Sequence, residues 1–158
     1  MFKSILCILL ILIFTGCAMF KSNICQNIPE GQTSVICQLA LATKVSPENM
    51  SITLQIANMA ALEKNLYTAK EAGKFIDSII IDLKNYKTSE ITISYYQAID
   101  YLNKKFKLLS PQAQVAFIII NPGALSEYKI DSPLSSYDID LIINHLVKER
   151  AIVSAYGG

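Results

Sequence analysis

The sequence contains few of the residues on which common catalytic and binding chemistries depend. It has no tryptophan and a single histidine, and its 14 basic side chains are nearly balanced by 13 acidic ones. This balance provides neither the basic surface that binds nucleic acid nor an acidic tail. Hydrophobic residues make up 52% of the 158 residues, which is enough for one domain with a real core.

Sequence motifs of common enzyme classes are also missing. The chain has no Gly-x-Ser-x-Gly, no His-Glu-x-x-His and no glycine-rich phosphate loop. The lone His145 has Glu149 one helical turn away, and we interpret the two as a surface pair because a catalytic base needs a positioned partner. The sequence therefore predicts a protein that is not an enzyme and that has no cofactor.

A loose acidic group surrounds the longest loop near the end of the chain, at Glu127, Asp131, Asp138 and Asp140. The spacing is not that of a calcium loop, and no pair is singled out as the two carboxylates of a glycosidase. We predict no metal site. Glu127 and Asp131 are instead predicted to contact a partner.

The chain begins with its one long apolar run. Lys3 precedes an unbroken apolar stretch over residues 5–14, and the small residues Thr15 and Gly16 follow. A basic start, a short apolar core and a small-residue site are typical of a secretory signal.

The tetrad Phe14-Thr15-Gly16-Cys17 resembles the lipobox of bacterial lipoproteins. The resemblance covers residues 1–17 only. It implies that the signal is removed and that Cys17 carries a diacylglyceryl group, with an acyl chain such as palmitate on the new amino terminus. Two or three chains hold a protein where one would not, since each buried methylene contributes roughly 0.8 kcal/mol.

The resemblance also implies a location in the bacterial cell envelope. Ala18 stands where many inner-membrane lipoproteins of enteric bacteria have Asp, which implies the outer membrane, facing the periplasm. Two alternatives remain open. The apolar stretch is near the lower length limit of a membrane-spanning helix, and an ordinary cleaved signal followed by a chance cysteine would look similar.

Two of the four cysteines remain once the signal and the anchor are set aside. Cys7 lies in the signal and Cys17 is the lipidation site, which leaves Cys25 and Cys37 in a compartment where disulfides persist. We predict that they form a structural disulfide. In the chain-entropy account such a loop stabilises the fold by roughly 3 kcal/mol.

The rest of the chain reads as a series of amphipathic helices. A short helix is expected over residues 34–44, and four further helices have starts marked by serine or threonine residues that can cap a first turn. These starts lie at Ser46, at Thr68, at Thr88 or Ser89, and at Ser135 or Ser136. Thr68 and Glu71 also match the capping box, in which each side chain accepts from the other residue's backbone amide.

The Ser46 helix has its strongest apolar residues on one side. Ile52, Ile56, Met59 and Leu66 recur at helical spacing, and we expect this side to face the core of a bundle. One more element starts at Ser110-Pro111 and includes the run from Val115 to Ile120. We favour a helix for that run, although its composition would also suit a strand.

These observations predict an all-α bundle of four to six helices with a disulfide-tied N-terminal loop. The expected segments are a signal at residues 1–16, a lipidated tether and loop at 17–33, and a helical domain at 34–158. The adjacent Tyr95 and Tyr96 cannot both face a core, so we predict that they contribute to a partner contact.

The predicted function is a non-enzymatic binding or structural module of the envelope. Its expected partners are membrane lipid through Cys17 and an envelope protein or peptidoglycan, but not nucleic acid. A carrier of an apolar ligand between helices and a small envelope hydrolase are the alternatives.

Overall fold

A computed structural model describes most of the chain after residue 22. The described residues are 23–26, 28–31, 33–89, 92–111, 113–114, 130 and 132–158. Cys17, the run from Val115 to Ile120, Glu127 and Asp131 lie outside these ranges, so the predictions for them stay predictions.

The fold is an all-α bundle, as the sequence predicts. The helices are α2 (Asn23–Gln26), α3 (Val35–Thr43), α4 (Pro47–Glu63), α5 (Ala69–Thr88), α6 (Tyr95–Phe106) and α9 (Ser136–Ala155). Among the described residues, strand pairing is limited to one isolated antiparallel bridge between Ser94 and Pro133.

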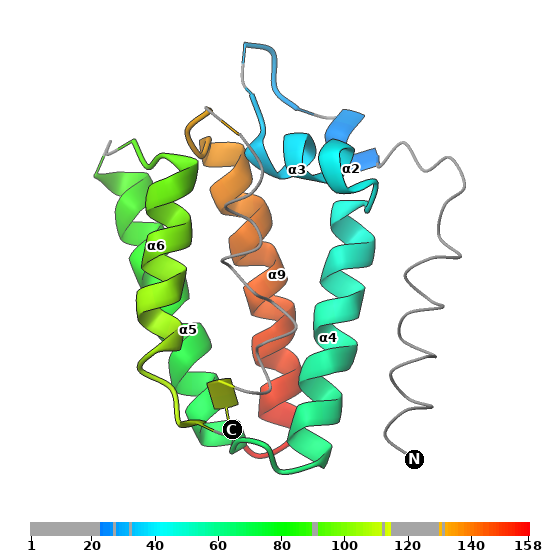
Figure 1. Ribbon diagram of the computed structural model, residues 1–158, viewed down its shortest axis with the longest axis vertical. Helices are drawn as coiled ribbons and strands as arrows, with labels where there is room; N and C mark the ends of the chain where they lie inside the picture. Colours follow the sequence, from blue (N-terminus) through cyan, green and yellow to red (C-terminus); the bar gives the residue numbers. More distant parts are fainter. Residues whose placement is uncertain are drawn as a thin grey trace.

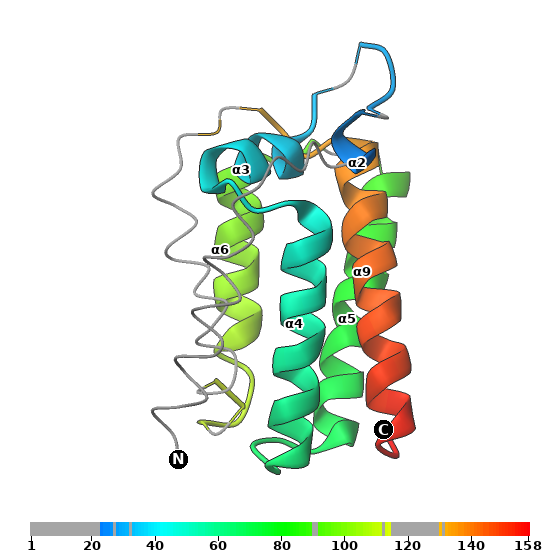
Figure 2. The same ribbon diagram turned by 90° about the vertical axis from the view of Figure 1, so that its right-hand side faces the viewer.

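Helix α9 is the central helix of this bundle. The long helices α4, α5, α6 and α9 lie along the long axis, and α3 lies across one end (Figures 1 and 2). Helix α9 packs against both α5 and α4. Helices α4 and α5 run antiparallel, as expected, and Asn65 adopts a left-handed conformation with φ of 53° in the turn between them.

Serine caps explain where several helices begin. The hydroxyls of Ser46 and Ser135 accept hydrogen bonds from the amides of Asn49 and Asp138, which confirms both predicted starts. Ser110 likewise accepts from the amide of Ala113, at 3.3 Å. In each case the side chain satisfies an amide that has no partner inside the helix.

One predicted helix start is wrong. Thr88 and Ser89 do not start a helix, because their hydroxyls donate to carbonyl oxygens of the last turn of α5. Helix α6 starts later, where Ser94 and Gln97 form a complete capping box.

The predicted capping box at Thr68 is only half present. Thr68 accepts from the amide of Glu71 at 3.1 Å. The Glu71 carboxylate instead accepts from the amide of Ser110, 3.0 Å away, and so links the start of α5 to the chain after α6.

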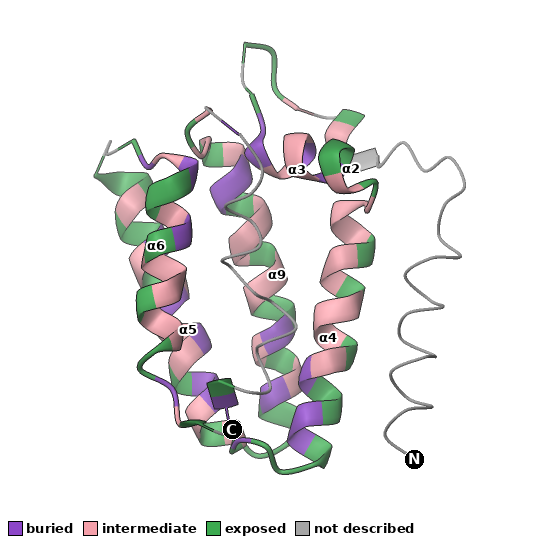
Figure 3. Cartoon of the chain, in the orientation of Figure 1, coloured by how far each residue is buried: buried purple, intermediate pink, exposed green. Residues whose placement is uncertain are grey.

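The apolar core forms three clusters along the bundle (Figure 3). The largest, at the end near the α4–α5 turn, is centred on Leu62, Ile76 and Val153. A second cluster at the opposite end joins Val35 of α3 to Tyr95 of α6. The third lies between α5 and α9.

The predicted apolar side of α4 faces the core only in part: Ala61 and Leu62 are buried in the largest cluster, but four large apolar residues that we expected there are exposed. Ile52 is 53% exposed, Ile56 48%, Met59 40% and Leu66 39%. Helix α4 turns a more polar side toward α9, because Ser51 and Asn58 have hydrogen-bond partners there.

The N-terminal loop is fixed to the bundle by two different links. The predicted disulfide between Cys25 and Cys37 is present, with Cα atoms 5.6 Å apart, and it joins α2 to α3. The second link is Asp138, one of the loose acidic group noted in the sequence, which is fully buried.

Asp138 accepts hydrogen bonds from two helix starts at once. Its Oδ1 accepts from the Ser34 hydroxyl at 2.5 Å and from the Ile36 amide at 3.1 Å. Its Oδ2 accepts from the Val35 amide at 3.0 Å, and from the amide and hydroxyl of Ser135 at 3.0 and 2.9 Å. One carboxylate therefore caps α9 and holds α3, 104 residues away in sequence.

We predict that Asp138→Asn destabilises the fold by about 3 kcal/mol, since an amide replaces one accepting oxygen in a buried site full of donors. The control is Asp140→Asn two residues on, where the carboxylate forms a half-exposed pair with Lys87 and its loss should cost under about 1 kcal/mol. Urea denaturation of the two variants measures the difference. Equal losses of unfolding free energy in the two variants would mean that the buried hydrogen bonds of Asp138 stabilise the fold no more than the exposed Asp140–Lys87 pair does.

Candidate functional site

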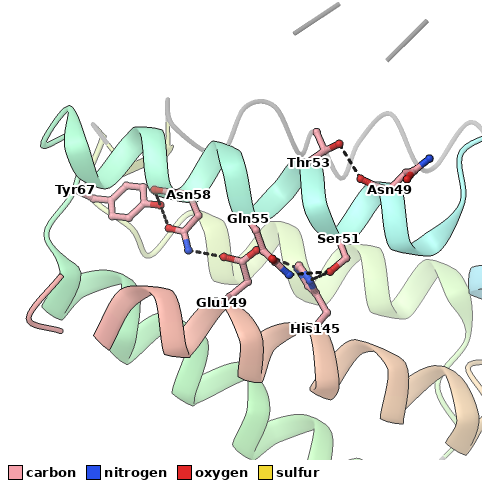
Figure 4. Close-up of polar contacts among 8 residues, drawn as sticks. All are labelled: Asn49, Ser51, Thr53, Gln55, Asn58, Tyr67, His145 and Glu149. Carbon is pink, nitrogen blue, oxygen red and sulfur yellow. Dashed lines mark hydrogen bonds and ion pairs between the residues drawn. The ribbon is translucent and has the colours of Figure 1, made fainter. Parts of the chain in front are cut away.

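A row of polar side chains runs along the interface between α4 and α9 (Figure 4). Ser51, Gln55 and Asn58 come from α4 at helical spacing, so they lie on one side of that helix. His145 and Glu149 come from α9, one turn apart. Tyr67, from the α4–α5 connection, closes the row at the other end.

The hydrogen bonds of this row connect the α4 side chains and Tyr67, directly or through one another, to His145 and Glu149. Ser51 Oγ lies 2.7 Å from His145 Nδ1 and accepts from Gln55 Nε2 at 3.2 Å. Asn58 donates to Glu149 Oε2 at 2.5 Å, and the Tyr67 hydroxyl donates to Asn58 Oδ1.

The other carboxylate oxygen of Glu149 has no hydrogen-bond partner among the described residues. Glu149 Oε1 lies 3.6 Å from His145 Nε2, which is an ion-pair distance rather than a hydrogen bond. The pair is present, as predicted, but it is not a surface pair. The exposed fractions of the two side chains are 21% for His145 and 7% for Glu149.

Burial changes the proton affinities of both groups in opposite directions. It raises the pKa of the Glu149 carboxyl, although the hydrogen bond from Asn58 acts the other way. It lowers the pKa of His145, and the positive charge of Lys148 lowers it further. Burial also raises the pKa of the Tyr67 hydroxyl, with a smaller contribution from the charge of Glu149. Each shift favours the neutral form of a group removed from water.

The order serine, histidine, carboxylate is that of a nucleophile, its base and an orienting acid. The surroundings do not complete such a site. Ser51 lies inside α4, where the neighbouring backbone amides form helix hydrogen bonds, so among the described residues they are not free to bind a developing oxyanion. The row is therefore best described as a buried polar contact that aligns α4 with α9.

A groove of about 380 Å³ lies between α5 and α6. Leu83, Ile93 and Leu134 supply apolar lining, while Tyr86 and Tyr101 meet edge to face with ring centres 6.3 Å apart. This volume is at the small end of the range for small-molecule sites. The groove is lined by both apolar and polar side chains, so it is where a carrier of an apolar ligand would bind its ligand.

Tyr101 is held in place by Asp82 and Lys105. Its hydroxyl donates to Asp82 at 2.6 Å, and Lys105 pairs with the same carboxylate at 2.9 Å while lying 5.5 Å from the Tyr101 ring centre. The hydrogen bond from Tyr101, and then that from Lys105, lowers the pKa of Asp82. One wall of the groove is thus fixed before any ligand binds.

The adjacent tyrosines that we predicted as a contact surface have different environments. Tyr95 is buried against Val35 and Ile99, whereas Tyr96 is 46% exposed, and the two ring centres are 5.8 Å apart. Of the pair, Tyr96 alone offers a large surface to a partner.

The described part of the chain shows neither a metal-binding cluster nor a membrane-spanning helix. No group of three or more His, Cys, Asp or Glu side chains there is arranged to hold a metal ion. No described helix is both long enough and apolar enough to span a bilayer.

Comparison with protein-family models, with curated proteins and with solved structures found no match to this chain. A functional proposal must therefore be argued from the residues themselves.

Sequence reasoning found the His145–Glu149 pair but missed the row to which it belongs. The polar residues of α4 at positions 51, 55 and 58 recur at helical spacing. That periodicity was the available signal, but the larger apolar residues between them dominated the pattern.

We predict that Glu149→Gln stabilises the fold at pH 8 by about 1 kcal/mol and that this gain disappears toward pH 5. A raised carboxyl pKa means that the folded state binds the proton more tightly, so the stabilising contribution is present at low pH and is lost as the pH rises through the folded-state pKa. Urea denaturation across this pH range measures the effect.

His145 contributes with the opposite sign, because its lowered pKa gives stability above its ordinary pKa that is lost as the pH falls through the folded-state value. The matched control is Glu63→Gln on the exposed surface of α4, where the carboxylate accepts a hydrogen bond from the Tyr156 hydroxyl at 3.2 Å. A pH-independent gain from Glu149→Gln would contradict the assignment.

Proposed function

We propose that this protein is a lipid-anchored lipoprotein of the bacterial cell envelope that acts as a non-enzymatic binding or structural module. The observation that carries the proposal is the Thr15-Gly16-Cys17 site at the end of the apolar run. Cys17 carries the lipid, and the domain faces the periplasm from the outer membrane.

The disulfide supports the proposed compartment. Cys25 and Cys37 are bonded and join α2 to α3. Structural disulfides form and persist in oxidising compartments such as the periplasm and are rare in the cytoplasm. The bond lies just after the proposed anchor, so it would stiffen the chain between the lipid and the bundle.

The exposed side of α4 supports a binding role over catalysis. Four large apolar side chains are exposed on one stretch of the surface, at Ile52, Ile56, Met59 and Leu66. Contiguous exposed apolar surface marks an interaction site more often than scattered single residues do. The polar row beneath it joins α4 to α9, and the backbone amides around Ser51 are used within the helix.

A carrier of an apolar ligand is the second candidate. The groove between α5 and α6 favours it, since its lining combines leucine and isoleucine side chains with two tyrosine rings. Native mass spectrometry of the protein released gently from membranes tests this candidate. A stoichiometric small molecule that is lost in Ala98→Trp, which fills the groove, would favour the carrier over the module.

We predict that cells incubated with a clickable fatty acid attach it to this protein through Cys17. Cys17→Ser should lose the label and release the protein from the membrane fraction, because no acyl chain remains to hold it. The matched control, Cys7→Ser, changes a cysteine inside the signal and should keep the label. Equal labelling of wild type and Cys17→Ser would overturn the anchor.

A further inference from the structure

Helix α4 presents polar side chains to α9 along most of its length, and its apolar contribution to the core comes from Ala61 and Leu62 near its end. Ser51 and Asn58 point into the interface with α9, where their hydrogen bonds are made. The α4 stripe, which we define as Ile52, Ile56 and Met59 of α4 together with Leu66 from the turn that follows the helix, is exposed. The exposed parts of α4 lie on its side away from α9 (Figure 3). Since apolar side chains gain by leaving water, this arrangement calls for a covering surface.

A second copy of the chain fits this stripe poorly. Its four side chains are each about half exposed or less, so together they offer on the order of 300 Å². A stable protein interface usually buries about 800 Å² on each partner.

The position of the proposed anchor points to a different occupant. Five residues separate Cys17 from Asn23, the first residue of α2, so α2 lies within about 20 Å of the acyl chains. The disulfide fixes α2 to α3, and α3 leads through residues 44–46 directly into α4. In Figure 1, α2 and α4 lie on the same side of the described bundle. The anchor would therefore hold the α4 side close to the membrane.

The charges around the stripe suit a lipid surface without requiring anionic lipid. Lys44 and Lys64 are exposed just before and just after α4, where long lysine stems can reach the headgroup region. Glu48 and Glu63 balance them, so no net positive charge attracts the helix to the bilayer. Burial of apolar side chains is the remaining attraction.

We propose that the α4 stripe lies against the lipid bilayer, with its apolar side chains in the headgroup boundary, so that the bundle rests on its side and not upright on its tether. This inference rests on the proposed lipid anchor. The anchor supplies the lasting attachment, so a contact too small for a stable dimer suffices to set the orientation. The groove between α5 and α6 is then left free for a partner.

The absence of tryptophan gives a direct test, because one introduced tryptophan is the only reporter of its kind. The lipidated full chain carrying Ile56→Trp is reconstituted into phosphatidylcholine vesicles containing brominated lipid, at low and high salt. The matched control is Ile81→Trp, an isoleucine that is 58% exposed on α5. Ile81 lies on α5, which packs against α9, and it is not part of the α4 stripe, so we expect this position to remain in water.

We expect I56W to be quenched by brominated lipid at least several-fold more strongly than I81W, and to the same extent at both salt concentrations. Equal quenching of the two variants while the protein floats with the vesicles would overturn the α4 contact but leave the anchor intact. A blue-shifted I56W signal without bromine quenching, together with a doubled mass, would replace the bilayer by a second copy. Failure to float would overturn the anchor and this inference together.

Discussion

The buried carboxylate of Asp138 is the interaction on which the arrangement of this bundle depends. It accepts hydrogen bonds from the first turn of α3 and from the residue that caps α9, so both helices meet at one charge. Buried charge is tolerated when its hydrogen bonds are made, and here each carboxylate oxygen has at least two donors. The disulfide then joins α2 to the helix that Asp138 has already fixed.

A second buried carboxylate, Glu149, has fewer hydrogen bonds than Asp138. It lies three turns further along α9 and has a firm hydrogen bond on one oxygen only. The row of α4 side chains that meets it makes the α4–α9 interface polar. The inner side of α4 thereby holds residues that would otherwise face solvent, and Ile52, Ile56 and Met59 are left outside. The exposed stripe and the buried polar row are thus two sides of one arrangement.

Local features of the sequence were enough to predict most of the fold. Serine caps at Ser46 and Ser135 are read from neighbouring residues, because the donors they satisfy lie three positions away. The disulfide was predicted because Cys25 and Cys37 are the two cysteines left once Cys7 is assigned to the signal and Cys17 to the lipid, in a compartment where disulfides persist. The orientation of α4 could not be predicted in this way, since it depends on Glu149 and His145, more than 90 residues distant. The prediction that the apolar side of α4 faces the core was right for Ala61 and Leu62 and wrong for Ile52, Ile56, Met59 and Leu66.

The burial of Asp138 also lay beyond local reasoning. An aspartate in a first helical turn normally interacts with the helix dipole at the surface, and only the approach of Ser34 and its neighbours makes this one buried. Because Tyr95 and Tyr96 are adjacent on a helix, the sequence predicted that one of them is exposed, and the structure shows that it is Tyr96. The groove between α5 and α6 did not, because it combines residues from two helices and from Leu134.

Native-state hydrogen exchange of the Val35 and Ile36 amides tests the role of Asp138 most directly. Amides in a first helical turn have no partner within the helix and usually exchange quickly. If Asp138 fixes α3 to α9, these two amides exchange as slowly as those in the middle of α9. Rapid exchange at both positions, with α9 itself protected, would contradict the account.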